Sequence, residues 1–256
     1  MEVHHSHHSH AKKNFKEYIT EFLMLFLAVS LGFLAENIRE HQIEINRGKI
    51  YLAELKADLI NDSISLQNKV FLVQNQKEAA DSIYALYRKG DWEKHINEIY
   101  FYYAIISLRN SWEPNDATWE QAINSGTLRY LNNEELVKKL KAYYFHIKTM
   151  KNREERILTM MDNYFEKYRQ IHFISPSITA NKDFASVMDI VNKSVKPKMP
   201  VFTMQHKILN KDQFDFDTYV NAVARLQGTR NLDLNSLIYR GIEMNKELID
   251  LLHATE

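Results

Sequence analysis

Residues 22–35 read FLMLFLAVSLGFLA, fourteen positions without a charged side chain, and no other stretch of the sequence runs uninterrupted for as long. Crossing the roughly 30 Å hydrocarbon core of a bilayer takes about 20 residues. The longer window between Lys16 and Arg39 reaches that length. We therefore expect a single N-terminal transmembrane helix over residues 17–38.

Two other interpretations of this stretch were weighed. A cleaved signal peptide fits poorly, because Glu17 and Glu21 precede the apolar run and Phe33 occupies the −3 position of a cleavage point after Ala35. A buried helix of a soluble domain remains the alternative, since the uncharged run is shorter than a full span. A membrane anchor accounts best for both observations.

The small and charged residues of the anchor, except Thr20 and Ser30, lie on one helical face. At 100° of rotation per residue, these residues lie within about 60° of Glu21 around the helix axis. The stripe consists of Glu21, Ala28, Gly32, Ala35, Glu36 and Arg39. Because lipid tails are as apolar as leucine, helices in a bilayer associate through small residues, and Ala28-x-x-x-Gly32 has that spacing. The stripe predicts a helix–helix interface in the membrane. An ionisable Glu21 within the span also leaves open a role in ion conduction.

Cations around the span do not decide its orientation. The positive-inside rule counts Lys12, Lys13 and Lys16 before it and Arg39, Arg47 and Lys49 after it. Partly protonated histidines in the preceding tail favour a cytoplasmic N-terminus. These histidines are His4, His5, His7, His8 and His10. Closely spaced imidazoles can bind Zn, Ni or Cu without a fold, but a low-complexity tail is the simpler interpretation. We assign no metal site and no cofactor.

A long stalk helix is expected to follow over residues 39–90. It contains no Pro, and Arg88-Lys89-Gly90 is a typical helix end, with cations over the last carbonyls and Gly for the left-handed cap. An apolar stripe at three-four spacing runs through Leu52, Leu55, Leu59, Leu66, Val73, Ala80, Ile83 and Tyr87. Polar Asp62, Lys69 and Gln76 interrupt it, so we expect it to pack on helices of the same domain rather than in a strict two-stranded coiled coil.

Beyond Gly90, a few Gly, Pro and helix-capping residues divide the sequence into segments of helix length. Expected helices cover residues 91–108, 114–125, 133–172, 182–192, 211–226 and 233–253. Ile99 to Ile106 is apolar nearly all round and should be buried. The predicted fold is all-α: a single N-terminal transmembrane helix, a long stalk helix, and an antiparallel helical bundle over residues 91–256.

Composition excludes several classes of protein. Six Gly and four Pro in 256 residues argue against turn-dense β architectures, and the absence of Cys excludes disulfides and thiolate sites. Zero net charge gives no reason to expect nucleic acid as a partner. No Walker loop, nucleophile elbow or His-Glu-x-x-His motif is present, and Asp212, Asp215 and Asp217 are better explained by helix capping than by calcium binding. We expect a protein that is not an enzyme.

Two stretches resemble a family of uncharacterised bacterial single-pass membrane proteins that is known as a domain of unknown function. The first is YITEFLMLFLAVSLGFLAENIREHQIE at 18–44, continued by YLAELKADLINDSISLQ at 51–67; the second is ATWEQAINSGTLRYLNNEELVKKLKAYY at 117–144. The matching positions are Glu21, Glu36-Asn37, Leu52-x-x-Leu55-x-x-Asp58 and Asn124-Ser125-Gly126-x-Leu128. The resemblance implies a bacterial inner-membrane anchor with a periplasmic helical domain, and it implies no catalytic residues.

These observations together predict a membrane-anchored helical scaffold or accessory subunit. Its partners would be membrane lipid and, through the anchor and stalk, a second copy of itself or another membrane protein. Two further hypotheses remain open: an extracytoplasmic ligand sensor, and a subunit of an ion-driven motor or channel that uses Glu21.

Overall fold

The computed structural model describes residues 14–109, 112–131, 133–173 and 184–254. Regular structure in these residues is helical, apart from an isolated antiparallel bridge between Phe173 and Ile208. The chain divides into two compact units, residues 1–50 and 51–256, which we call the N-terminal unit and the bundle unit. The predicted all-α fold, with a long N-terminal helix followed by a helical bundle, is confirmed.

Helix α1, Phe15–Lys89, forms all the regular structure described in the N-terminal unit. It begins where the backbone N–H of Asn14 donates to the Glu17 carboxylate (3.1 Å) and the backbone N–H of Glu17 donates back to the Asn14 carbonyl (2.8 Å). This reciprocal arrangement satisfies amides that the first helical turn would leave without partners. The helix therefore begins at Phe15, N-terminal to the apolar run that starts at residue 22.

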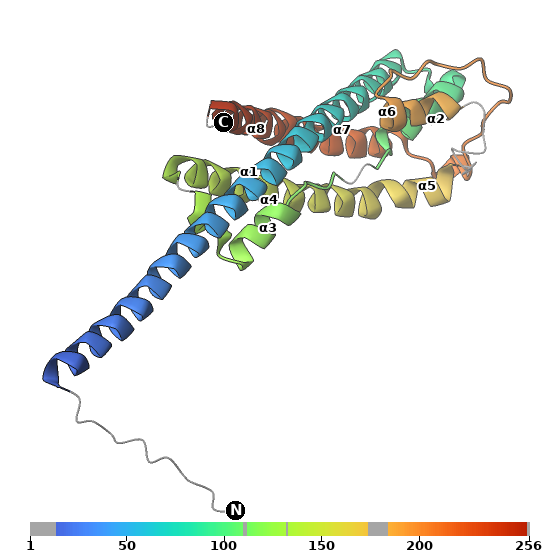
Figure 1. The fold of residues 1–256 in the computed structure, drawn as a ribbon. Coiled ribbons are helices and arrows are strands. Elements are labelled where there is room, and N and C mark those ends of the chain that lie inside the picture. The colour runs from blue at the N-terminus through green and yellow to red at the C-terminus, as the bar shows by residue number, and fades with distance from the viewer. Residues whose placement is uncertain (1–13, 110–111, 132, 174–183, 255–256) are drawn as a thin grey trace, which may run out of the picture. The chain divides into compact units, whose positions relative to one another are not determined.

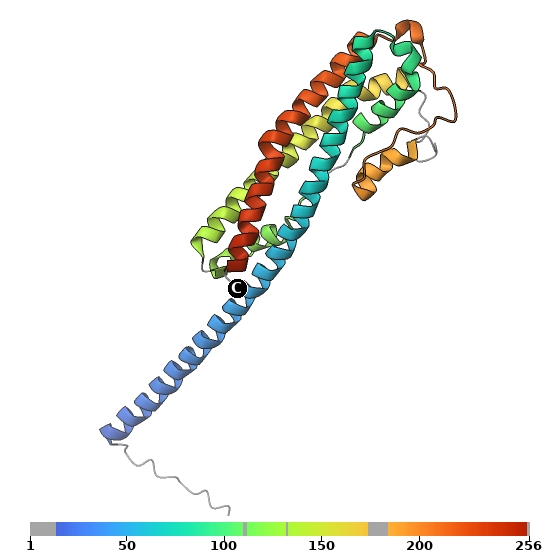
Figure 2. The same cartoon turned by 90° about the horizontal axis from the view of Figure 1, so that it is seen from above.

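Within the bundle unit, the part of α1 from Tyr51 onward lies beside α4, Glu134–Met160, and beside the consecutive helices α7, Phe216–Asp233, and α8, Tyr239–Ala254 (Figures 1 and 2). The contacts fix the directions of these helices. Asp62 meets Tyr143 and Lys69 meets Glu154, so α1 and α4 run the same way. Asn245 meets Leu59 and Tyr239 meets Gln74, so α8 runs antiparallel to α1.

The shorter elements carry the chain back from the end of α1 to the start of α4. They are the 3₁₀ turn η1 (Trp92–His95), α2 (Ile96–Ile106), α3 (Ala117–Asn124) and the 3₁₀ turn η2 (Thr127–Leu131). This return explains why the bundle is only partly antiparallel. As the apolar run of 99–106 predicts, α2 is buried almost all round.

Two buried clusters form the core of the bundle unit. One joins α2, α6 (Ala185–Lys193) and the first turns of α7 to the end of α1, and it is dominated by stacked aromatic rings such as Tyr103 against Phe173 at 4.5 Å. The other joins the first part of the bundle segment of α1 to α4 and α8 around Leu55, Leu59 and Leu140, all fully buried. Burial at about 25 cal/mol per Å² of apolar surface is the main stabilising contribution.

Several helix ends lie where the sequence predicts them. The helix α1 ends at Lys89, and Gly90 takes a φ of +72°, the left-handed conformation of a helix C-cap. Gly126 does the same after α3 with a φ of +69°. Asn133 caps α4, because its side chain accepts from the Leu136 backbone N–H at 3.0 Å. Local capping chemistry thus sets these boundaries.

Two predicted boundaries are wrong. The helix expected to start at Pro114 starts at Ala117, because the backbone N–H of Asn115 donates to Asp62 at 2.9 Å and holds the preceding residues as a loop. The break expected between residues 226 and 233 is absent: α7 passes through Gly228 and continues through a π-helical turn, η6 (Leu234–Ile238), into α8.

The remaining expectations hold more closely. The helix predicted over 133–172 is found as α4, the π-helical turn η3 (Met161–Glu166) and α5 (Lys167–His172) without a break. A third predicted boundary is wrong: the helix expected from residue 211 starts at Phe216, and residues 211–213 form only a short 3₁₀ turn, η5 (Lys211–Gln213). Asp215 then caps α7 by accepting from the Asp217 backbone N–H at 3.0 Å, which confirms its capping role.

Candidate functional site

The apolar part of α1 in the N-terminal unit is a candidate membrane-spanning segment. Among the described residues, α1 is the one helix that is long and apolar enough to cross a membrane, and none of its most apolar window is buried inside the chain. Phe22, Leu25 and Phe33 are 66%, 68% and 74% exposed. Contiguous exposed apolar surface of this extent requires lipid or another protein around it.

The six residues of the predicted stripe all lie on this exposed part of α1. Glu21 is half-buried, and the other five are exposed: Ala28, Gly32, Ala35, Glu36 and Arg39. A Cβ built on Gly32 meets no atom within 4 Å, so the small-residue face is open to a second helix. The structure therefore leaves this face accessible.

Of the stripe residues, Glu36 and Arg39 contact each other directly. The Arg39 Nε donates to the Glu36 carboxylate at 2.9 Å, and a second guanidinium nitrogen makes another contact with it. Both side chains remain more than half exposed. The pair neutralises two charges at one end of the predicted span, which reduces the cost of placing them beside lipid headgroups or against a partner helix.

The histidine tail, His4 to His10, lies outside the described residues. Within the described ranges, no group of three His, Asp or Glu side chains is placed to hold a metal ion. A histidine and a glutamate on the same helix, His146 and Glu154 of α4, could in principle serve as a base and an acid, but they are not brought together: the His146 Nε2 lies 2.8 Å from the Leu237 carbonyl oxygen, whereas Glu154 pairs with Lys69.

Sequence reasoning missed the buried hydrogen-bond network around Asp62. This carboxylate is fully buried; its Oδ1 accepts from the Asn115 backbone N–H and side-chain amide, both at 2.9 Å, and its Oδ2 accepts from the Tyr143 hydroxyl at 2.8 Å. Asn245 donates to that hydroxyl at 3.3 Å and to the Leu59 carbonyl at 2.8 Å. The network ties α1, α4, α8 and the loop before α3 together, which makes it structural.

A second buried polar cluster lies farther along the same face of α1. The Lys69 Nζ donates to Glu154 at 2.6 Å, and the Arg230 guanidinium donates to the Ile106 carbonyl at 3.0 Å. Arg153 pairs with Asp233 at 2.8 Å. Burial lowers the pKa of Lys69, and it lowers the pKa of Arg230 to about 10, so the guanidinium stays cationic at neutral pH. Lys69, Glu154, Arg230 and Asp233 line a cavity of about 30 Å³, which has room for a water molecule.

The one sequence signal for both networks is the interrupted stripe. Asp62, Lys69 and Gln76 replace apolar residues at every seventh position, and all three are buried. Gln76 donates to the Leu108 carbonyl at 3.0 Å. The expectation that this stripe packs on helices of the same domain is confirmed. The hydrogen-bond and ion-pair partners of its polar residues lie far away in the sequence, so residue spacing alone cannot identify them.

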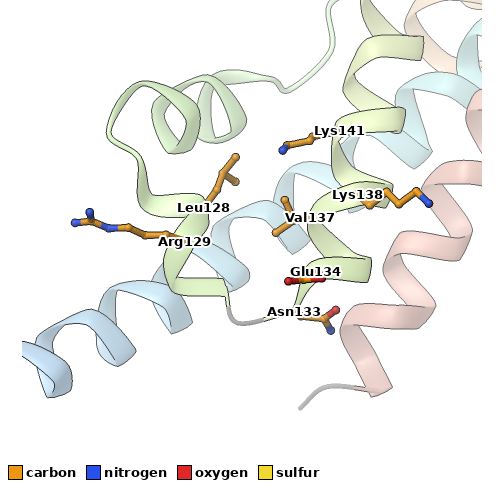
Figure 3. A pocket seen from close by; sticks show the side chains of 7 residues that line it. All are labelled: Leu128, Arg129, Asn133, Glu134, Val137, Lys138 and Lys141. Atoms are coloured by element: carbon orange, nitrogen blue, oxygen red, sulfur yellow. The ribbon is translucent and has the colours of Figure 1, made fainter.

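An open groove in the bundle unit lies at η2 and the first turns of α4 (Figure 3). Its volume is about 710 Å³, and it is lined by Leu128, Arg129, Asn133, Glu134, Val137, Lys138 and Lys141. Lys141 points across the groove towards Leu128, whereas Arg129 and Lys138 point away to opposite sides (Figure 3). Three cations against one carboxylate favour an anionic ligand, but they do not converge on one point.

A scan against protein-family models finds no match, and searches of curated proteins and of solved structures find none either. The function of this chain therefore has to be argued from its own residues.

Proposed function

We propose that the chain is a membrane-anchored helical scaffold or accessory subunit, which joins a membrane protein complex or oligomerises through its anchor and stalk. In this proposal the anchor lies in a bacterial inner membrane, the tail of residues 1–16 is cytoplasmic, and the bundle unit is periplasmic. Its partners are membrane lipid and either a second copy or another membrane protein.

One observation supports the proposal most strongly. A face of small and charged residues begins at the half-buried Glu21 and is exposed from Ala28 to Arg39, on a helix whose other faces are mainly apolar and exposed. A helix that only had to hold the chain in lipid would need no such face. Close approach at Ala28 and Gly32 gives van der Waals packing that lipid tails cannot match, since Gly32 has no atom within 4 Å of a built Cβ.

The experiment compares substitutions on the two faces of the anchor. Gly32→Leu fills the proposed interface, whereas Ser30→Leu adds a comparable side chain about 180° away on the helix. The full chain is extracted from membranes in a mild detergent, and its assembly is measured by light scattering and by mass spectrometry of copurifying proteins. We expect Gly32→Leu to weaken association about tenfold, for a loss of about 1–2 kcal/mol. Ser30→Leu should leave it unchanged.

Two results would refute the scaffold proposal. One is wild-type protein that alkaline carbonate washes from the membrane. The other is wild-type protein that runs as a monomer and copurifies with no other protein.

A ligand sensor is the second candidate, and the groove of Figure 3 favours it. Lys138 and Lys141 of α4 line the groove together with Val137, and Lys141 points into it. An anionic ligand in this groove should raise the melting temperature of the full chain in a saturable way. Lys141→Gln should abolish that rise, and Lys148→Gln on the same helix is the matched control. A melting temperature unaffected by anionic ligands would leave no support for a sensor.

A further inference from the structure

The face of α1 that points away from the bundle carries an apolar stripe of its own. Ile60 and Ile64 are 43% and 57% exposed, and Ala53 and Ala57 are exposed beside them. The spacing 53, 57, 60, 64 alternates four and three residues, which is the a/d pattern of a coiled coil. A solvent-facing helix surface ordinarily carries polar residues there.

The sequence continues this register towards the anchor. Counting back in steps of seven residues from Ala57 places Ile50 and then Ile43 at a positions, and one such step back from Ala53 places Asn46 at a d position. Six of the seven a/d positions from 43 to 64 are thus apolar, over three heptads. This stripe is distinct from the interrupted stripe of Leu55, Leu59 and Leu66, which is fully buried in the bundle.

The burial pattern leaves the stripe exposed from Ile50 to Ile64, and Ile43 is half-buried. In the same register Leu55 and Asp62 are f positions, on the side opposite the a/d seam, and both are fully buried. A second helix can therefore approach the seam while each bundle stays on the outside. The exposed stripe ends before Asn68, whose side chain accepts a hydrogen bond from the Ser194 hydroxyl at 2.8 Å.

We propose that residues 43–64 form a parallel, in-register two-stranded coiled coil with a second copy of this chain. The proposal rests on the proposed function, because two copies anchored in one membrane present α1 in the same direction. A coiled coil of three heptads is marginal by itself, but the shared membrane raises the effective concentration of the second helix.

Charge complementarity favours this occupant and this orientation. In a parallel dimer, each g position faces the e position five residues later in the partner helix. Lys49 at g then faces a second copy's Glu54 at e, once on each side of the seam, and Lys56 faces the uncharged Asn61. An antiparallel pairing would set the g row of lysines against the same row of the other copy. Both Lys49 and Glu54 are exposed in the single chain.

The test uses the absence of native cysteine. Ala53→Cys and Ile64→Cys are introduced singly into the full chain, and membranes are oxidised with copper phenanthroline. The two positions lie about 16 Å apart along a helix, so a parallel in-register pair cross-links at both, whereas an antiparallel pair cross-links at one at most. Phe145→Cys, 74% exposed on α4, is the control for random collision and should not cross-link.

Substitutions then identify the contacts. Because Ile60 and Ile64 are exposed in the single chain, Ile60→Asp and Ile64→Asp should leave its melting temperature intact and lower the yield of the Ala53→Cys cross-link at least about tenfold. Lys49→Glu should lower the yield, and Lys49→Glu with Glu54→Lys should restore it. Absence of a cross-link at either Ala53→Cys or Ile64→Cys, or equal cross-linking at Phe145→Cys, would overturn the proposal.

The outcomes separate this inference from the proposed function. Membrane-bound protein that copurifies with another protein but gives no cross-link overturns the coiled coil and leaves the scaffold role standing. Protein that cross-links at Ala53→Cys and Ile64→Cys but washes off the membrane keeps the coiled coil and removes the membrane-anchored role.

Discussion

Two neighbouring tyrosines of α4 provide a sharp test of the buried network. Tyr143 and Tyr144 are 0% and 5% exposed. The Tyr143 hydroxyl donates to Asp62 at 2.8 Å, whereas among the described residues the buried Tyr144 hydroxyl has no hydrogen-bond partner. Burial, followed by the nearby Asp62 carboxylate, raises the pKa of both hydroxyls, so each remains a neutral donor near pH 7. Replacing each tyrosine by phenylalanine removes a hydroxyl from the same helix in nearly the same surroundings.

The expected costs differ in size. Tyr143→Phe removes a hydrogen bond to a charged group, which contributes about 1.5–3 kcal/mol, and leaves the Asp62 Oδ2 buried without that donor. In this variant Asn245 also loses its contact with the Tyr143 hydroxyl, but it keeps its hydrogen bond to the Leu59 carbonyl, so this second loss adds little to the cost. For a unit of roughly 200 residues, each kcal/mol changes the melting temperature by about 2–4 °C. We expect Tyr143→Phe to lower it by about 3–12 °C.

Tyr144→Phe should be neutral or slightly stabilising. Its hydroxyl gains no hydrogen bond in the fold and loses its contacts with water on burial, so removing it relieves a desolvation cost. The ring itself stays stacked on Trp119 at 4.8 Å. We expect a change of less than about 2 °C in the melting temperature, within about 0.5 kcal/mol.

The assay is thermal unfolding of the full chain in detergent, followed by circular dichroism at 222 nm. A double-mutant cycle of Tyr143→Phe with Asp62→Asn should give a coupling energy of at least about 1 kcal/mol, because the two groups share one hydrogen bond. Equal losses for Tyr143→Phe and Tyr144→Phe would refute the reasoning, since the cost would then come from the removal of any buried hydroxyl. A coupling energy near zero would refute it independently.

Three further predictions concern other parts of the chain. Glu154→Gln leaves the Lys69 ammonium buried without its carboxylate and should cost about 3–5 kcal/mol in urea unfolding at pH 7. Since burial lowers the pKa of Lys69 in the fold, the unfolded chain binds the proton more tightly, and the stability of this variant should rise from pH 7 towards pH 10; a flat profile would contradict this. Gly126→Ala should lower the melting temperature by about 2–4 °C because its φ is +69°, whereas Gly228→Ala, inside α7 with open space around it, should raise it by a similar amount. Glu21→Gln should leave membrane insertion unchanged, and a proton conductance of reconstituted vesicles that this variant abolishes would instead support an ion-driven role.

Local chemistry explains which parts of the fold were predictable from sequence. Gly90 and Gly126 end helices, and Asn133 starts one, because their effects depend only on the few residues around each cap. The helix start at Pro114 failed for the opposite reason. The loop there is held by Asp62, 53 residues away from Asn115 in the sequence, so no local pattern contains that information.

The same distinction applies to the candidate interaction surfaces. The stripe on the anchor is a property of one helix and can be read from spacing. The groove at η2 and α4 and the outward stripe at Ile60 and Ile64 depend on which faces the bundle covers. Periodicity favoured the leucine stripe of α1 because leucines are the stronger signal, and burial then showed that the weaker alanine and isoleucine stripe is the one left exposed.

The polar residues in the buried stripe of α1 also determine how the helix is set against α4. Asp62, Lys69 and Gln76 recur every seven residues, and a purely leucine stripe would pack nearly as well after a shift of one heptad. Here each position has a different chemistry and a different partner: hydrogen-bond donors for Asp62, the Glu154 carboxylate for Lys69, and a backbone carbonyl for Gln76. A shift of seven residues would place the Lys69 ammonium against the donors of Asn115 and leave Glu154 facing an amide. The cost of a buried cation without a carboxylate, about 3–5 kcal/mol, disfavours that register. The polar residues that weaken this stripe as a coiled-coil seam therefore fix the register of α1 in the bundle, and that register is what places Ile60 and Ile64 on the outward face.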